Sequence, residues 1–320
     1  MRFRPIASLS VAAAAVLLLA GCTGSPDQAQ TPDASATPDA GACQTPFTGE
    51  VPAGLEVSGD FQGPVTVTRP DGFTPTDVQR TTLIEGSGAE IAPGDIVKAN
   101  YTVIDAASGA VALDSLTTDP AGMDMVVNAQ QIFGAALSCV PIGSRTVSTF
   151  PAGLLGDGSP AYVLVADAIA ELPTRATGTE VPPVDGMPTV TLADDGAPTI
   201  TVPTTPAPTE TRIENLRRGD GDVVNPGDQV IVQYTGVLYD GGTVFDSSWD
   251  KGMPTEFPTT GVVAGFRQAL EGQTVGSQVI AVIPPADGYG DQEQGAIPAN
   301  STLVFVVDIL GVQHAPAAAQ

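Results

Sequence analysis

The sequence QVIVQYTG at residues 229–236 opens the stretch that decides the fold, and this stretch runs to residue 310. Its valines alternate with Ile231 and Gln233, a pattern that predicts a mostly buried strand. The turn DGG follows at residues 240–242, and because glycine adopts positive φ freely, this turn predicts a hairpin. The stretch therefore begins as a pair of antiparallel strands.

Apolar residues recur at helical spacing in residues 262–270, and Gly272 stands where a glycine would end the helix. One short helix among several strands predicts an α+β fold, in which a curved antiparallel sheet wraps on the helix. The space between them would be apolar, with Asp246 and the Tyr289 hydroxyl as its few polar groups. Such a space is typical of a small-ligand or peptide site.

Four further motifs follow in a fixed order, and with the YTG run they resemble the FKBP-type peptidyl-prolyl cis–trans isomerases. The resemblance covers about a quarter of the chain. It implies isomerisation of prolyl peptide bonds without a cofactor. The motifs are TVFDSSW at 243–249, IPPADGYG at 283–290, AIP at 296–298 and TLVFVVD at 302–308.

The resemblance assigns a catalytic pocket to nine residues. The Tyr289 hydroxyl and the main-chain amides of Val262 and Val263 would hold peptide carbonyl oxygens, and Asp246 would supply a carboxylate. The chain departs from the family at Phe266, where a tryptophan usually forms the pocket floor. The nine residues are Tyr234, Phe245, Asp246, Val262, Val263, Phe266, Tyr289, Ile297 and Phe305.

The expected chemistry fits these residue types. Rotation about a peptide bond is opposed by a barrier of roughly 18–20 kcal/mol because of amide resonance. The twisted transition state is less dipolar than the planar amide, so a dry apolar pocket disfavours the planar form. The implied partners are proline-containing unfolded or exported polypeptides, with macrolides as further candidate ligands.

Each residue also has a plainer interpretation. Aromatic residues at strand positions usually form a hydrophobic core, and Asp246 alone would be a turn or capping residue. Trp249 and Lys251 are expected to be exposed loop residues. The joint pattern, with a carboxylate inside an apolar run, favours the site.

Residues 43–172 resemble a weakened copy of the later stretch. Residues 83–103 align with residues 216–236 without a gap, and the same offset pairs Phe133 with Phe266. One inserted residue then pairs Asp114–Ser115 with Asp246–Ser247, so that Leu113 replaces Phe245. The other replacements in this copy are Leu164 for Phe305 and Val103 for Gly236, and the Tyr289 position has no counterpart.

This comparison predicts two FKBP-like domains, each a curved antiparallel sheet wrapped on a short helix. The first, at 43–172, would be degenerate and either structural or substrate-holding, with a plain spacer as the alternative. The second, at 211–312, would be the isomerase. Between them, residues 173–210 form a Pro/Thr-rich linker in which two alternating runs around Asp195–Gly196 resemble a hairpin at the second domain's edge. Residues 313–320 would be a frayed tail.

Residues 1–22 predict a lipoprotein signal peptide. A basic start precedes a mostly apolar run that ends LAGC at 19–22, which resembles the bacterial lipobox, and Cys22 would carry the lipid. The alternatives are an ordinary cleaved signal and an uncleaved anchor. Residues 23–42 lack apolar periodicity and would be a disordered tether or a leader with no role.

Two cysteines remain, Cys43 and Cys139, and in an exported protein they predict a disulfide. The alternative is two isolated buried thiols. A zinc site is not expected, because the one histidine, His314, falls in the C-terminal tail and is predicted to be solvated.

The composition limits the partners. The net charge of −24 argues against nucleic acid and against a polybasic surface for anionic lipid. The sequence thus predicts a membrane-tethered extracytoplasmic prolyl isomerase that assists folding of exported proteins. The alternative is a chaperone-like lipoprotein that holds unfolded chains without useful catalysis. A solute-binding receptor would show a long alternating βα pattern, which this sequence lacks.

Overall fold

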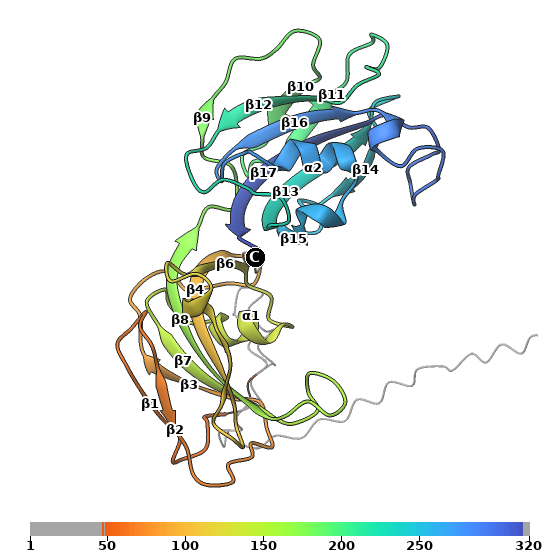
Figure 1. Cartoon of the computed structure of the whole chain (residues 1–320). Helices are drawn as coiled ribbons and strands as arrows, with labels where there is room; N and C mark the ends of the chain where they lie inside the picture. Colours follow the sequence, from red (N-terminus) through yellow and green to blue (C-terminus); the bar gives the residue numbers. More distant parts are fainter. Residues whose placement is uncertain (1–46, 48, 316–320) are drawn as a thin grey trace, which may run out of the picture. The chain divides into compact units, whose positions relative to one another are not determined.

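A computed structural model of the chain describes residue 47 and residues 49–315. Two antiparallel sheets dominate this part of the chain, each with one short helix (Figure 1). The described residues group as one compact unit, so the predicted division into two domains stays a prediction. We call residues 47–172 the first half and residues 173–315 the second half.

The first sheet has the strand order β3-β7-β8-β4-β5, with β6 also paired to β4. Helix α1 (Ile132–Leu137) packs against β7 and β8. The strands are β3 (Gln79–Ile84), β4 (Ile96–Asp105), β5 (Val111–Asp114), β6 (Met123–Val126), β7 (Arg145–Phe150) and β8 (Tyr162–Leu172).

The second sheet has the order β14-β13-β17-β16-β12-β9, with β15 also paired to β13. Helix α2 (Ala264–Leu270) packs against β16, and Gly272 follows it with a positive φ of 85°, as expected. The strands are β9 (Thr179–Glu180), β12 (Arg212–Arg218), β13 (Gln229–Leu238), β14 (Val244–Ser247), β15 (Thr255–Pro258), β16 (Gln278–Ile283) and β17 (Leu303–Gln313).

A hairpin covers the face of the second sheet that lies opposite α2. It consists of β10 (Thr189–Leu192) and β11 (Pro198–Thr201), and Ile200 is buried with Val304 and Val306 of β17. Both faces of the sheet are therefore covered, which explains why its strands are nearly continuous apolar runs. The two alternating runs predicted to form a hairpin do so, and β9, which pairs with β12, adds a strand that the expected linker did not include.

The first half carries the same kind of hairpin. Strands β1 (Glu56–Ser58) and β2 (Thr66–Thr68) pair, and their valines pack on buried residues of β7 and β8. Val57 pairs with Val67, and 133 residues later Val190 pairs with Ile200. The repeated unit therefore includes the hairpin as well as the sheet.

The strand registers show that the one-residue insertion in the sequence alignment, which paired Asp114 with Asp246, is wrong. In the first half Leu113 pairs with Val103 and Asp114 with Thr102. In the second half Asp246 pairs with Gly236 and Ser247 with Thr235. The two halves therefore match without a gap here, so Leu113 occupies the Asp246 position and Ala112 the Phe245 position.

Two hydrogen bonds give the same alignment. The Tyr101 amide donates to Ser115 Oγ at 2.9 Å, and the Tyr234 amide donates to Ser248 Oγ at 2.8 Å. Asp114 instead caps the 3₁₀ turn η1 (Ser115–Thr117), because its side chain accepts from the Leu116 amide. The first half thus lacks an aspartate equivalent to Asp246.

The expected solvated tail is partly ordered. His314 Nδ1 lies 2.8 Å from Oδ2 of the buried Asp228, and the Ala315 amide donates to Asp228 Oδ1 at 2.9 Å. His314 is exposed over 47% of its side chain, as expected of a solvated residue, but it also contacts Asp228.

Several predictions fall on residues that the structure does not describe. The signal segment, the tether, Cys22 and Cys43 all lie outside residue 47 and residues 49–315, so lipidation and the Cys43–Cys139 disulfide stay predictions. Within the described residues, no helix is long and apolar enough to cross a membrane.

Candidate active site

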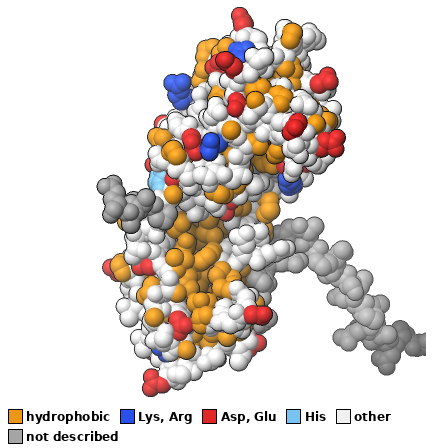
Figure 2. Space-filling model, turned by 45° about the vertical axis from the view of Figure 1, so that its right-hand side comes forward, with side chains coloured by type: hydrophobic (Ala, Val, Ile, Leu, Met, Phe, Trp, Pro, Cys, Tyr) orange, Lys and Arg blue, Asp and Glu red, His pale blue; other side chains and the backbone are white. Residues whose placement is uncertain are grey.

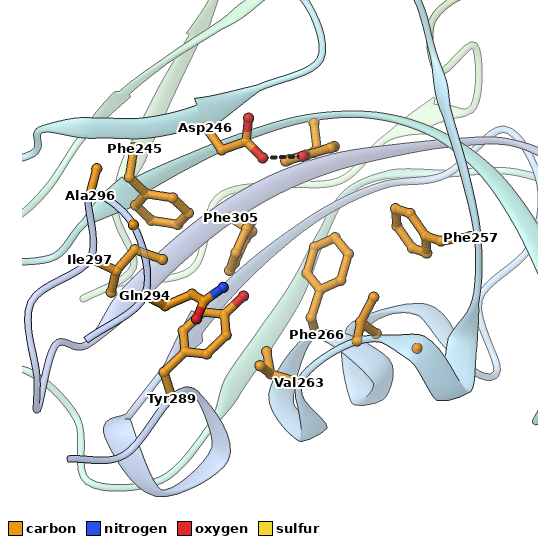
Figure 3. Close-up of a pocket in the computed structure, with 14 residues that line it drawn as sticks. Phe245, Asp246, Phe257, Val263, Phe266, Tyr289, Gln294, Ala296, Ile297 and Phe305 are labelled. Carbon is orange, nitrogen blue, oxygen red and sulfur yellow. Dashed lines mark hydrogen bonds between the residues drawn. The ribbon is translucent and has the colours of Figure 1, made fainter. Parts of the chain in front are cut away.

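A cavity of about 580 Å³ opens between α2, the strands β13, β14 and β17, and the loop before β17 (Figure 3). All nine residues of the predicted pocket line it. The sequence motifs, which are separated by up to 70 residues, thus meet at one place. Five further lining residues were not anticipated: Phe257, Gly261, Gln294, Gly295 and Ala296.

Aromatic rings form the floor and one wall. The centroids of Phe266 and Phe305 lie 4.6 Å apart, and those of Phe245 and Phe305 lie 5.4 Å apart with nearly perpendicular planes. Phe257 from β15 packs on Phe266 at 5.8 Å. Edge-to-face and tilted contacts at these distances stabilise the rings against one another and keep water out of the floor.

Gly236 makes the aromatic wall possible. A β-carbon at this position would lie 2.5 Å from Phe245 Cζ and 2.9 Å from Phe305 Cε1. Both distances are far shorter than a carbon–carbon contact allows. The YTG run therefore needs its glycine because two pocket rings approach the backbone of β13.

The polar side of the pocket is a chain of three side chains. Tyr234 Oη donates a hydrogen bond to Asp246 Oδ2, drawn as the dashed line in Figure 3. On the other carboxylate oxygen, Lys251 Nζ lies 2.6 Å from Asp246 Oδ1, and it sits 5.8 Å from the centre of the Tyr234 ring. The cation therefore contacts both the carboxylate and the aromatic face.

The protonation states follow from these contacts. Burial raises the pKa of Tyr234, and the hydrogen bond to the Asp246 carboxylate raises it further, so the phenol stays neutral. Burial opposes ionisation of Asp246, but hydrogen bonds from Lys251 and Tyr234 outweigh it and lower the pKa of Asp246. At neutral pH Asp246 is a carboxylate with a cation and a phenol as partners.

Of the two loop residues expected to be exposed, Lys251 is exposed and Trp249 is not. Lys251 is 55% exposed but pairs with Asp246. Trp249 is half-buried, and a β-carbon on Gly196 of the β10–β11 hairpin would lie 3.1 Å from its ring. No sequence pattern marked either contact, because both depend on segments that meet only in the folded chain.

The loop from 284 to 302 closes the remaining side. Gln294 and Ile297 exchange backbone hydrogen bonds at 2.9 Å, which holds Ile297 buried against the pocket core while Gly295 and Ala296 form the rim. Tyr289 follows the 3₁₀ turn η3 (Pro285–Asp287) and is 36% exposed at the mouth. Tyr289 therefore lines the open side of the cavity.

The α2 start supplies the last wall. Val263 has extended backbone dihedrals and caps the helix, and its carbonyl accepts from the Phe266 and Arg267 amides at 3.0 Å. Val262 and Val263 thus lie at the edge of the cavity, where the chain changes from turn to helix. Among the described residues, no group of His, Cys, Asp or Glu could hold a metal ion.

The matching region of the first half is filled differently. Tyr101 lies against Phe133 with ring centroids 4.4 Å apart and an angle of 35°. Its hydroxyl donates to Met123 Sδ at 3.1 Å instead of to a carboxylate. The tyrosine therefore occupies space that stays open in the second half, where Tyr234 and Phe266 are 6.2 Å apart.

Comparison with known proteins gives the same family for the second half. The family model described as FKBP-type peptidyl-prolyl cis-trans isomerase matches residues 221–310. A probable FK506-binding protein of Corynebacterium glutamicum is 38% identical over 98 residues, which cover 31% of this chain and 83% of that protein. The chain belongs to the FKBP-type peptidyl-prolyl cis–trans isomerase family.

Other members of the FKBP family match over a smaller share of their length. FkpA of Escherichia coli is 41% identical over 103 residues, which cover 32% of this chain and 38% of FkpA. The 22 kDa FKBP-type isomerase of Escherichia coli is 46% identical over 98 residues, covering 30% of this chain. This chain spans less than half of either Escherichia coli protein, at 38% and 47%.

Solved FKBP-type structures were also compared with the whole chain. The crystal structure of FkpA from Escherichia coli has a TM-score of 0.33 at 32% identity, covering 42% of this chain and 54% of that chain. An isomerase from Pseudomonas syringae has a TM-score of 0.31 at 27% identity, covering 41% of this chain and 84% of that chain.

Proposed function

We propose that the second half isomerises X–Pro peptide bonds in the cavity around Phe266. The observation that carries this proposal is the cavity itself, which is lined by six aromatic residues, among them the neutral phenol of Tyr234, and by the paired carboxylate of Asp246. Such a pocket desolvates a bound prolyl amide without offering a nucleophile. Nothing in this chemistry needs a cofactor.

The rate gain would come from the difference between two states of the amide. The planar amide is the more dipolar state and loses the most solvation on entering an aromatic pocket, whereas the twisted state loses less. Every 1.4 kcal/mol of that difference is about tenfold in rate. Phe305, Phe245 and Ile297 form the apolar wall, and the smaller Phe266 ring in place of a tryptophan leaves the floor wider.

Polar groups at the rim would hold the flanking peptide. The Tyr289 hydroxyl at the mouth and the backbone amides of Val262 and Val263 are the donors for carbonyl oxygens on either side of the prolyl bond. Asp246 is charged but already bound by Lys251 and Tyr234, so its main effect would be to fix the Tyr234 ring as a side of the pocket.

We further propose that the isomerase works outside the cytoplasm on a membrane anchor. The sequence from 1 to 22 supports an exported lipoprotein with the lipid on Cys22, and residues 23–42 would be the tether. Its partners would be unfolded proline-containing polypeptides on the same side of the membrane. Cys22→Ser should release the protein from the membrane fraction or leave the precursor unprocessed.

A disulfide between Cys43 and Cys139 belongs to the same proposal. Cys139 has a φ of 62°, at the position where Gly272 follows α2 with a φ of 85°. A side chain in the left-handed region is unfavourable, so a cysteine there suggests a specific use. Thiol labelling of the oxidised, denatured chain should find neither of these two cysteines reactive.

A proline-limited refolding assay tests the isomerase directly. The chain from Thr23 to Gln320 should accelerate the slow refolding phase of an unfolded protein, and Phe305→Ala should abolish this. Because Phe305→Ala also opens a core cavity, its melting temperature must be measured in parallel. A chain that binds unfolded protein but leaves the slow phase unchanged would contradict catalysis and favour the chaperone-like alternative.

A further inference from the structure

The first half exposes an apolar area on the same side of its sheet as α1. Figure 2 shows hydrophobic side chains gathered there, in the lower part of the view where Figure 1 places β3 to β8. Leu113 is 43% exposed, and Leu154 and Leu155 in the loop after β7 are 48% exposed each. Contiguous apolar surface of this kind usually marks an interaction site.

The strand registers assign side chains to this area. Leu113 pairs directly with Val103, which is buried in the α1-side cluster together with Phe133 and Tyr101. Met123 and Met125 of β6 pair with Ala99 and Val97, which belong to the same cluster. Directly paired residues share a face of the sheet, so Leu113 and both methionines lie on the α1 side.

At these positions the first half carries flexible aliphatic or thioether side chains in place of the charged, polar and aromatic side chains of the second half. Leu113 stands where Asp246 holds its cation, and Met123 and Met125 stand where β15 has Thr255 and Phe257. Methionine is flexible and adapts to partners of varied shape. The first half has therefore replaced a narrow aromatic cavity with a shallow, adaptable surface that Tyr101 and Phe133 close from below.

The first half as a whole is strongly acidic. Residues 47–172 contain 15 acidic and four basic residues. Three of the four bases bind within the half: Arg80 donates to the α1 carbonyls, Lys98 pairs with Asp124, and Arg145 pairs with Asp167. The fourth, Arg69, interacts with Asp105. Asp157 stands in the same loop as Leu154 and Leu155 and is exposed.

We propose that this α1-side surface of the first half binds extended polypeptide segments that are apolar and flanked by lysine or arginine. Leu113, Met123, Met125 and the two loop leucines would contact the apolar side chains, and the surrounding carboxylates would attract the flanking cations. Proline is not required, because Tyr101 packs against Phe133 with ring centroids 4.4 Å apart, closer than the 6.2 Å between Tyr234 and Phe266. The proposal does not depend on isomerase activity in the second half.

A matched pair of substitutions on one strand tests it. Leu113→Asp places a charge in the surface, whereas Val111→Asp changes a more exposed residue, 59% exposed, that pairs with Ile104 and so faces the other side of the sheet. The probe is a fluorescent proline-free peptide of leucine, phenylalanine and alanine with lysines at both ends. Its binding to the chain from Thr23 to Gln320 is measured by fluorescence anisotropy.

We expect Leu113→Asp to weaken peptide binding roughly tenfold, because one leucine contact is lost, and Val111→Asp to leave binding unchanged. A peptide with glutamates in place of the lysines should bind at least about tenfold more weakly. Both variants should keep wild-type isomerase activity. Leu154→Ser, in an exposed loop, is the second variant should Leu113→Asp lower the melting temperature.

Other outcomes would overturn the proposal. Equal effects of Leu113→Asp and Val111→Asp would place the peptide elsewhere. Tighter binding after deletion of residues 23–42 would show that the chain's own segment occupies the surface. A dimer that Leu113→Asp dissociates would show that the surface joins two copies of this chain.

Discussion

The two halves share a framework but differ at the positions that face the pocket. Their hairpins pair in the same register 133 residues apart, as Val57–Val67 and Val190–Ile200 show. Their central strands also pair in equivalent registers, Val103 with Leu164 and Gly236 with Phe305. In one half, Gly236 leaves room for Phe245 and Phe305, and in the other Val103 fills that room beside Ala112 and Leu164. The framework thus tolerates the loss of the site, because strand pairing and hairpin burial do not depend on it.

A second difference lies on the hairpin side of each sheet. In both halves an aspartate of the last strand accepts a hydrogen bond from a backbone amide of an earlier segment. The Gln62 amide, between β1 and β2, donates to Asp167 at 2.7 Å, and the Ala176 amide, before β9, donates to Asp308 at 2.8 Å. A side chain of the neighbouring strand also donates to each aspartate: Arg145 of β7 to Asp167, and Gln278 of β16 to Asp308. The same bridge is therefore ionic in one half and amide-based in the other.

The largest effect is expected from breaking the ionic bridge. Arg145→Met would leave Asp167 buried without its cation and remove donors to the Gly59 and Asp60 carbonyls, so the first half should lose about 3–5 kcal/mol of stability. Hydrogen exchange, read separately over residues 56–68 and 189–201, should show loss of protection in the first hairpin only.

Gln278→Met is the matched control. Asp308 keeps the Ala176 amide, and burial already raises the pKa of Asp308, so the loss should be nearer 1–2 kcal/mol, about that of one buried hydrogen bond. Equal losses in the two halves would show that the charge of Arg145 contributes nothing beyond its hydrogen bonds.

Exchanging Gly236 and its first-half counterpart Val103, which differ between the two pocket regions, should have the next largest effect. Gly236→Val, which copies the first half, would push Phe245 and Phe305 apart, so isomerase activity should fall at least about tenfold and stability by about 1–3 kcal/mol. The reciprocal Val103→Gly should leave activity unchanged in the refolding assay. Retained activity in Gly236→Val would place the chemistry outside this cavity.

Low pH should affect the stability contributed by the turn before β13 more than that contributed by the turn before β4. Burial opposes ionisation of Asp228, but bonds from the Ala315 and Asn225 amides and from His314 lower its pKa. Because the folded pKa is the lower one, the carboxylate stabilises above its ordinary pKa of about 4, and the stabilisation is lost as pH falls through the folded value.

Asp228→Asn should therefore cost on the order of 1 kcal/mol near pH ~7 and progressively less toward pH ~2. Asp95, which accepts from the Ala92 amide at 2.7 Å in the matching turn, provides the control variant Asp95→Asn. Thermal unfolding across this pH range should show the larger pH-dependent change in Asp228→Asn. Identical pH profiles would contradict a role for the His314 and Ala315 contacts.

The smallest effect is expected from removing the Tyr289 hydroxyl, a hydrogen-bond donor that the first half lacks. Tyr289→Phe keeps the ring and removes the hydroxyl, so the isomerisation rate should fall only severalfold, the equivalent of one hydrogen bond of about 0.5–1.5 kcal/mol. The melting temperature should barely move, because Tyr289 is 36% exposed. An unchanged rate would remove Tyr289 from the proposed mechanism.

The sequence predicted the pocket residues well because each belongs to a short motif whose order the fold preserves. All nine line one cavity. Lys251 was missed because a lysine in a loop carries no periodicity, and its ion pair with Asp246 exists only once the turn after β14 is formed. Phe257 was missed because its neighbours gave no strand pattern long enough to recognise.

The alignment of Asp114 with Asp246 failed because local identity is weaker evidence than backbone pairing. The Asp-Ser pair at 114–115 resembles that at 246–247, yet backbone pairing sets the register and places Leu113 at the position equivalent to Asp246. The hairpin before the second sheet was predicted from its two alternating runs, but β9 was not, because prolines and threonines dominate that segment. The sequence also could not show that Val190 and Ile200 pack on an apolar face of the second sheet, because that face exists only once its strands have paired.

The hairpins also determine how late each half can complete its folding. Val190 shares a buried cluster with Val304, 114 residues further along the chain, and Val57 shares one with Val163. A hairpin made first therefore has no surface to pack on until the last strand of its half has arrived. Contacts of such long sequence separation slow folding and prolong the exposure of apolar strands. A protein proposed to speed the folding of others would thus have a slow, late-closing folding reaction of its own.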